Sequence, residues 1–212
     1  MDGLDFLKKD WDKENHNYTQ VSEVDIYKML HKNSSSNVKW ILIIGIIEFI
    51  VWTGIGFFFN TDDYIKSIHA EEMMVYLKIL TYINYIVVLF FIYRFYQNYR
   101  NISTMVSTKQ LMKDIIKTRK TVHQYVWYNL AMISVSMILG FIMAFLYNPK
   151  LTVLKNKIAN DDNNAILLKI VCILVLTIVV LVTLFWLFYK LLYGILLRRL
   201  NSNYKELRKI EI

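Results

Sequence analysis

The sequence is poor in cysteine, proline and glycine: of 212 residues, one is cysteine, one is proline and six are glycine. The single cysteine, Cys172, lies inside an apolar run and cannot form an intrachain disulfide or a CxxC metal or redox pair. The chain is therefore not a disulfide scaffold. Isoleucine, lysine, asparagine and tyrosine are favoured over alanine, glycine, proline and arginine, a bias that is common in AT-rich bacterial genomes.

Charge is absent from long stretches of the chain. Hydrophobic residues make up 56% of the sequence and charged residues 20%, with a mean hydropathy of +0.34. An average soluble domain is about 45–50% apolar. Here the apolar residues form long runs, and short polar stretches between them carry nearly all the lysines and arginines. This pattern indicates an integral membrane protein and excludes a disordered chain or a soluble enzyme with a large core.

Four apolar segments are long enough to cross a bilayer, which takes about 20 helical residues. We expect a first span over 38–59, a second over about 73–93, a third over about 125–147 and a fourth from about 165 to 197. Lys39 to Asn60 and Lys169 to Lys190 each cover about 31 Å of helix, so each pair is expected to bracket one crossing. No segment alternates apolar and polar residues as barrel strands do. The sequence predicts an all-α, four-helix transmembrane bundle with short amphipathic cytoplasmic helices.

The basic residues predict the orientation of the spans. Nineteen of the 25 lysines and arginines lie in the N-terminal tail, the loop between the second and third spans, or the C-terminal end. By the positive-inside rule both termini and this loop are cytoplasmic in an inner membrane, and the loops at about 60–72 and 148–164 are outside. The net charge of +8 then reflects topology and contact with the lipid bilayer. No nucleic-acid motif accompanies it, so we expect no nucleic-acid partner.

The tail of residues 1–37 is patterned although it is too short to fold alone. Its first apolar stripe consists of Leu4, Leu7 and Trp11, spaced as on one helix face. Ser22 and Asp25 then match a capping box, and Ile26 and Leu30 lie one turn apart on the helix that follows. We expect residues 34–37 to interrupt this helix before the first span. The helices either lie on the inner leaflet or pack on the bundle; alternatively, Leu4, Leu7, Trp11, Ile26 and Leu30 form a docking face for a soluble partner.

Residues of about 98–123 are expected to form a helical hairpin that extends the second and third spans into the cytoplasm. Ser107 or Thr108 caps its second helix, and the C-terminal residues 198–212 form a basic tail. One side of that helix is expected to be apolar and much of the rest basic; the apolar residues are Leu111, Met112, Ile115, Ile116 and Val122.

Three predicted spans place a polar side chain at a similar depth. Glu48, Asn84 and Ser134 each lie about 13–15 Å from the inner boundary, counted from Lys39, Arg94 and Gln124. A charged, unpaired carboxylate is costly in hydrocarbon, at about 2.5–3.5 kcal/mol for a central aspartate. We therefore expect Glu48 to face the bundle interior, in one hydrogen-bonded layer with Asn84 and Ser134. The alternative is a carboxylate that handles protons or binds a substrate; Lys78 is a candidate countercharge.

The sequence has no recognisable catalytic or metal-binding motif. There is no HExxH, glycine-rich phosphate loop or GxSxG, and His16, His31, His69 and His123 do not show ligand spacing. The acidic and amide cluster at 160–164 lacks the glycine and terminal glutamate of an EF-hand and is expected to cap the fourth span. We therefore expect no cofactor and no metal.

The stretch from Trp11 to Ile50, with IYKMLHKNSSS at 26–36 and VKWI at 38–41, resembles a group of small four-span membrane proteins of flavobacteria. The group has no settled function, and its members sometimes carry the automated label beta-carotene 15,15'-monooxygenase. That label implies either a propeller that holds iron with four histidines or histidines within or near the spans. The chain has neither a strand pattern nor a histidine within a predicted span, so its residues do not support the label.

From these features we expect a non-enzymatic membrane protein that acts through its cytoplasmic tail and loop on a cytoplasmic protein partner. Its layout is similar to that of membrane-anchored regulators such as anti-sigma factors, although the zinc-binding signature of that class is missing. The alternative is a small transporter or membrane enzyme organised around Glu48.

Overall fold

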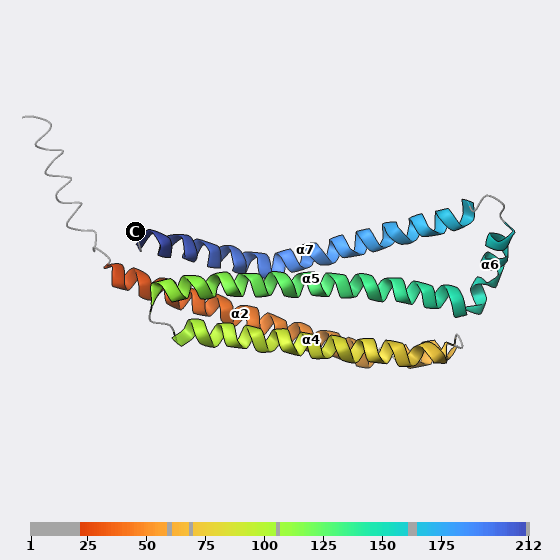
Figure 1. Cartoon of the computed structure of the whole chain (residues 1–212), viewed down its shortest axis with the longest axis horizontal. Coiled ribbons are helices and arrows are strands. Elements are labelled where there is room, and N and C mark those ends of the chain that lie inside the picture. Colours follow the sequence, from red (N-terminus) through yellow and green to blue (C-terminus); the bar gives the residue numbers. More distant parts are fainter. Residues whose placement is uncertain (1–21, 59–60, 68–69, 105–106, 161–164, 211–212) are drawn as a thin grey trace, which may run out of the picture.

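The computed structural model describes residues 22–58, 61–67, 70–104, 107–160 and 165–210, and it contains no strand within these ranges. Four long helices dominate: α2 (Glu23–Phe58), α4 (Glu71–Thr104), α5 (Thr108–Tyr147) and α7 (Ala165–Ile210). They run alternately up and down, side by side (Figure 1). Each is long and apolar enough to cross a membrane. The predicted all-α four-helix fold is confirmed, and the protein is a multi-pass membrane protein.

Three short helices lie at one end of the bundle. The helix α3 (Thr61–Ser67) lies between α2 and α4, while the 3-10 turn η1 (Pro149–Leu151) and α6 (Thr152–Ala159) lie between α5 and α7. α5 ends at Tyr147, and Pro149 follows its C-cap residue Asn148, since the proline ring cannot continue a helix. At the opposite end, α4 and α5 are separated by a short connection at 105–107, and Ser107 occupies the N-cap position of α5 without a side-chain bond.

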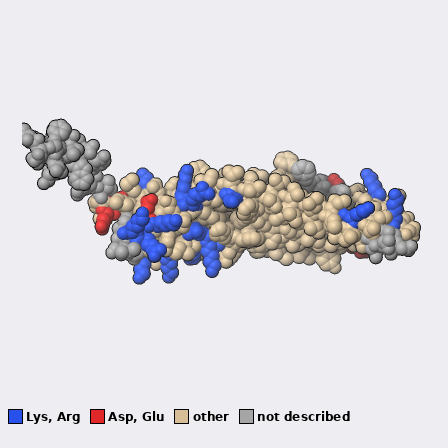
Figure 2. Space-filling view, turned by 90° about the horizontal axis from the view of Figure 1, so that it is seen from above, with Lys and Arg blue, Asp and Glu red and all other residues tan. Residues whose placement is uncertain are grey.

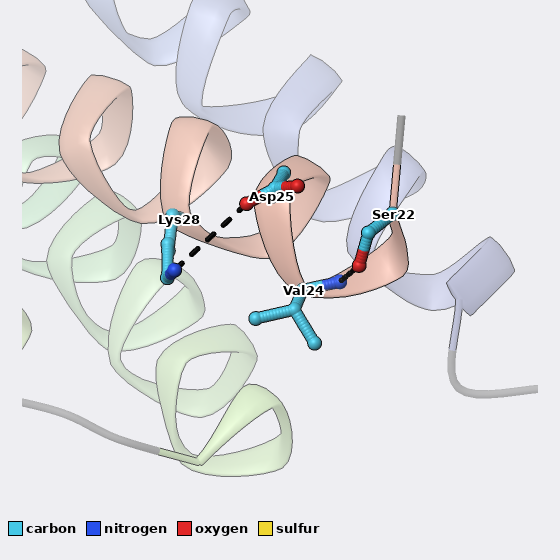
Figure 3. Close-up of polar contacts among 4 residues, drawn as sticks. All are labelled: Ser22, Val24, Asp25 and Lys28. Atoms are coloured by element: carbon cyan, nitrogen blue, oxygen red, sulfur yellow. Dashed lines mark hydrogen bonds and ion pairs between the residues drawn. The ribbon is translucent and has the colours of Figure 1, made fainter. Parts of the chain in front are cut away.

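The start of α2 shows half of the predicted capping box (Figure 3). The Ser22 Oγ accepts a hydrogen bond of 3.2 Å from the Val24 N–H, which satisfies one of the free amide groups of the first turn. The Asp25 carboxylate does not cap in return: it lies 3.8 Å from Lys28 Nζ, as an i,i+3 ion pair on the exposed side of the helix.

The predicted break at residues 34–37 is wrong, because α2 is continuous from Glu23 to Phe58. Ser34 and Asn37 are both buried, and Asn203 Nδ2 on α7 donates to Ser34 Oγ at 3.0 Å. Serine and asparagine weaken a helix by offering the backbone alternative hydrogen bonds. Here the Ser34 hydroxyl bonds α7 instead, and contacts between helices decide the local conformation.

The C-terminal segment is likewise helical through Ile210 and is not a separate tail. Leu200 and Leu207 on this segment are fully buried. They join a core built from Leu30, Ile102, Leu111, Ile115 and Val122, so all four helices pack together at this end. In the predicted apolar face of 98–123, Met112 is half-buried, whereas Ile116 is 48% exposed and lies off the core side.

The opposite half of the bundle is open. The most apolar 18-residue window of α7 contains no buried residue, and Figure 1 shows α7 diverging from the other helices toward Ala165. A small separate cluster of Ile65, Ala70 and Met143 packs near α3. Lipid tails are as apolar as leucine, so such a face needs no protein cover.

The contacts between helices place four basic residues near one level. His31 Nε2 lies 2.7 Å from the Ile102 carbonyl oxygen. Lys39 lies eight residues after His31 on α2, and Arg94 lies eight residues before Ile102 on the antiparallel α4. Lys39 and Arg94 are therefore at about the same level. The Ser34–Asn203 bond places Arg198 opposite Lys39, five residues on along each helix. The Arg119–Asn201 bond places Lys120 near the same level.

Figure 2 shows basic side chains gathered toward the end that holds the C-terminus and a smaller group at the other end. Between the two groups, the face shown carries a band without charged side chains.

The two predicted lysine brackets are not level with each other. Tyr189 contacts Glu48, and Asn203 contacts Ser34. The two contacts lie 14 residues apart on α2 and also 14 residues apart on α7. Lys190 therefore lies at the depth of Glu48, about 13 Å from the level of Lys39. Lys190 is exposed, and its Nζ lies 4.7 Å from the centre of the Trp186 ring. Because α7 is apolar well beyond one crossing, its sequence alone did not show where the bilayer begins.

Candidate functional site

The most heavily bonded polar group of the described membrane spans is the carboxylate of Glu48 on α2. Its side chain is only 8% exposed and faces the inside of the bundle. The Tyr189 hydroxyl donates a hydrogen bond to Oε1, and the Tyr193 hydroxyl donates to Oε2 at 3.1 Å. Residues four apart lie on one face of a helix, so α7 presents both hydroxyls to the same carboxylate.

Aromatic rings enclose this group on its other sides. The Tyr125 ring of α5 is 1% exposed and packs edge-on against Tyr193, with ring centres 6.0 Å apart. The Tyr125 hydroxyl and the Trp52 indole N–H lie within interaction range of Glu48. Trp52 is one helical turn beyond Glu48 on α2, so both side chains project from the same face.

A glycine allows the close approach of α2 to its neighbours. Gly45 lies three residues before Glu48, and a Cβ at this position would meet the Phe95 ring at 3.3 Å. Phe95 is fully buried and packs edge-on against Tyr125 at 5.4 Å. The missing side chain of Gly45 thus lets the aromatic cluster lie against the helix that carries the carboxylate.

Two cavities adjoin the Glu48 cluster. A partly open cavity of about 560 Å³, the interior cavity, lies among all four long helices, and its walls include Tyr125, Tyr189, Asn84 and Asn129. A groove of about 630 Å³ between α2 and α7 is almost entirely apolar, and Glu48 lies in its wall. Small-molecule sites of proteins usually measure about 300–1,000 Å³, so both spaces are of ligand size.

The predicted layer of Glu48, Asn84 and Ser134 is not bonded as expected. Glu48 is buried and hydrogen-bonded, but its partners are tyrosines. Asn84 Oδ1 accepts from the Tyr128 hydroxyl at 3.1 Å, and Ser134 Oγ donates to the Leu130 carbonyl of its own helix. Ser134 satisfies itself locally, as serines in helices often do. The polar groups therefore form separate pairs instead of one layer.

Lys78 is not the countercharge of Glu48, because its Nζ lies 2.9 Å from Asp62 Oδ2 of the short helix α3. Within the residues that the structure describes, no basic side chain forms an ion pair with Glu48. The described residues supply hydrogen-bond donors to this carboxylate, among them the hydroxyls of Tyr189 and Tyr193. Hydrogen bonds to a charged group are stronger than neutral ones, but they add no compensating charge.

The proposed docking face is only partly described. Leu30 is buried in the core of the chain itself, and Ile26 packs partly against the same core. Of the alternatives for this helix, the structure therefore shows packing on the bundle, and Leu30 is not free to contact a partner. Leu4, Leu7 and Trp11 lie outside the described residues.

Metal-binding residues do not converge anywhere in the described ranges: no group of three His, Cys, Asp or Glu side chains lies close enough to hold a metal ion. His31 contacts the Ile102 carbonyl, and Cys172 is exposed. Asn160 ends α6, with its N–H bonded to the Asn156 carbonyl. The cap of the fourth span was predicted from the cluster at 160–164, of which 161–164 lie outside the described residues.

Sequence reasoning missed the tyrosines. Tyr189 and Tyr193 have the spacing of one helix face, and Tyr125 begins the third predicted span. Tyrosine is common at both membrane boundaries, so a tyrosine in an apolar run does not by itself indicate a buried cluster. Two tyrosines at i,i+4 with an acidic residue on another span were the available signal for a buried cluster.

These features define an integral membrane protein whose four helices enclose a carboxylate and tyrosine cluster beside a cavity. The chain belongs to the family described as Domain of unknown function (DUF8845), whose model matches residues 24–212. No curated protein and no solved structure matches the chain.

Proposed function

We propose that this protein binds a small, mostly apolar molecule within the membrane, with Glu48 and its tyrosines as the polar end of the site. The observation that carries the proposal is that one buried carboxylate lies in the wall of a groove of ligand size, while its hydrogen-bond partner Tyr189 lines a second cavity of ligand size. An acidic residue within a span is costly and usually marks a functional site. Transport of the bound molecule is the natural extension of this role.

The composition of the cavity wall supports the same proposal. Sites for small molecules are mostly apolar with a few convergent polar groups. Here Asn84, Asn129 and Tyr189 reach the interior cavity among apolar and aromatic side chains. A purely structural hydrogen bond would need no adjacent space, whereas a binding site does.

A cavity-filling substitution tests the proposal. Ser136 lines the interior cavity, and its neighbour Val135 is 43% exposed and does not line it. The protein is extracted with its surrounding lipid in polymer discs, and mass spectrometry identifies the small molecules that co-purify with it. We expect a molecule that is enriched with the native protein and with Val135→Phe but lost from Ser136→Phe. Equal amounts of the same co-purified molecules from all three proteins would refute the proposal.

A second candidate function is that of a membrane-anchored regulator that acts on a cytoplasmic protein through its N-terminal tail and central loop. One observation favours it: the four helices continue as a packed bundle beyond the level of Lys39 and Arg94, for about 15 Å along α4 and about 24 Å along α2. The exposed side of α5 on this extension is basic. A membrane pocket alone does not require such an extension. This proposal includes cytoplasmic termini and an inner-membrane location.

Deletion of residues 1–21 tests the regulatory role without removing any buried residue of α2. Crosslinking followed by affinity purification would compare the full chain with the deletion variant. We expect a partner that is captured by the full chain and lost with the deletion. Recovery of the same proteins by both would contradict a docking tail.

A further inference from the structure

The interior cavity and the lateral groove meet at a pair of aromatic rings. Trp52 of α2 and Phe185 of α7 line both spaces, as does Leu181. The Trp52 and Phe185 ring centres lie 6.0 Å apart. Ring contact of this kind is held by dispersion and modest electrostatics. Trp52 and Phe185 therefore lie at the boundary between the groove and the cavity.

The groove faces the bilayer. Val51, Leu184 and Phe188 line it and are each at least half-exposed. A molecule dissolved in the lipid would reach the carboxylate from the side, between α2 and α7. At the other end, the packed core of Leu30, Ile115 and Leu207 fills the bundle. The path through the groove is thus shorter than a path to Glu48 through the packed end of the bundle.

The charge balance of the site indicates what such a molecule carries. Both carboxylate oxygens of Glu48 accept hydroxyl hydrogen bonds, and no described basic side chain pairs with the group. A bound cation would compensate the charge of an ionised Glu48, and a bound anion would add to it.

The aromatic rings add a second preference for a cation. The faces of tyrosine and tryptophan rings attract cations, most strongly where water is excluded. Tyr125, Tyr189, Tyr193 and Trp52 surround the carboxylate on three helices. The rest of the wall is apolar and suits a hydrophobic body.

We infer that the site takes a lipophilic monocation, which enters the groove between α2 and α7 from the bilayer and pairs with Glu48 beside the Trp52 and Phe185 rings. This inference rests on the proposed function, because it names the chemical class of the molecule that binds beside Glu48.

Two matched probes test the charge. Methyltriphenylphosphonium is a lipophilic monocation, and triphenylphosphine oxide has the same three phenyl rings without net charge. Binding of both is measured by equilibrium dialysis to the full-length protein in phosphatidylcholine discs, with empty discs as the background. We expect the cation to bind at least tenfold more tightly than the oxide, a difference of about 1.4 kcal/mol.

Variants connect this preference with Glu48. Glu48→Gln should remove the preference for the cation, and Glu48→Asp, which keeps the charge, should retain part of it. Glu72→Gln at the exposed start of α4 is the matched control and should bind like the native protein. A melting curve by circular dichroism checks that each variant is folded. A native protein that binds the oxide as tightly as the cation overturns the cation assignment but leaves the proposed function in place.

The route is tested by kinetics. Trp52→Ala should speed both association and dissociation of methyltriphenylphosphonium, because it removes a ring that lines the groove beside Glu48. Trp40→Ala, three turns earlier on α2 and exposed, should leave both rates unchanged. Unchanged rates in Trp52→Ala would refute the lateral route. No binding of either probe above empty discs would refute the inference, and the Ser136→Phe comparison then decides separately whether the cavity binds any molecule.

Discussion

Replacing Glu48 by leucine should destabilise the protein because it leaves two tyrosine hydroxyls without an acceptor. Measured hydrogen bonds between side chains in a membrane protein average about 0.6 kcal/mol, with a maximum of about 1.7 kcal/mol. Glu48 accepts from Tyr189 and Tyr193, so Glu48→Leu should lower the free energy of unfolding by about 1–3 kcal/mol. Glu48→Gln keeps an oxygen acceptor and adds an amide donor, and should stay within about 0.5 kcal/mol of the native protein.

The same reasoning predicts a rescue. An unsatisfied buried hydroxyl is costly, whereas removal of both partners of a hydrogen bond is nearly neutral. Adding Tyr189→Phe and Tyr193→Phe to Glu48→Leu should therefore recover most of the lost stability. The assay is reversible unfolding by SDS in mixed micelles, followed by circular dichroism. Glu72→Leu at the exposed start of α4 is the control and should change stability by less than about 0.5 kcal/mol.

Additivity is the result that would refute this account. If Glu48→Leu and the two tyrosine substitutions each cost stability and their costs add in the triple variant, the side chains do not interact. A coupling free energy of at least about 1 kcal/mol is expected, since two hydrogen bonds are involved.

Two further predictions concern packing and orientation. Gly45→Ala and Gly54→Ala gain the same helix propensity, but only the first places a Cβ at 3.3 Å from the Phe95 ring, while Gly54 has open space. Gly45→Ala should therefore be less stable than Gly54→Ala by about 1 kcal/mol in the same SDS assay, and equal stability would contradict the close approach of α2. Reporter fusions after Asn101 and after Asn156 should give cytoplasmic and external signals respectively, and the opposite signals would reverse the orientation.

The existence of the four spans was predictable because it depends on length and apolar composition, which one sequence displays directly. The depth of one span relative to another was not predictable. When α7 is considered alone, Lys190 marks the end of a segment with the length of one crossing. The contact between Tyr189 and Glu48 nevertheless places Lys190 well inside the level of Lys39. Relative depth depends on pairing between helices, and no single apolar run contains that information.

The fate of an amphipathic face was also beyond sequence analysis. Leu30 has the spacing of a residue that packs against lipid, against a partner or against the bundle, and these three environments select the same apolar residues. The structure shows Leu30 in the core of the chain. Ser34 shows the opposite error. Its polarity favoured a break in the helix, but Asn203 donates a hydrogen bond to it, and Ser34 is buried in the contact between α2 and α7.

The two ends of the bundle are packed differently, and Glu48 lies between them. Toward Leu30 and Leu207 all four helices share one packed core, whereas the apolar window of α7 beyond Tyr189 has no buried residue. Glu48 lies where the packed part ends and the cavities begin. A carboxylate placed only to hold helices together would serve best where the helices already touch on all sides. Its position at the edge of the open part instead gives an arriving molecule access to a charge held by a rigid support, which is the arrangement that a membrane binding site needs.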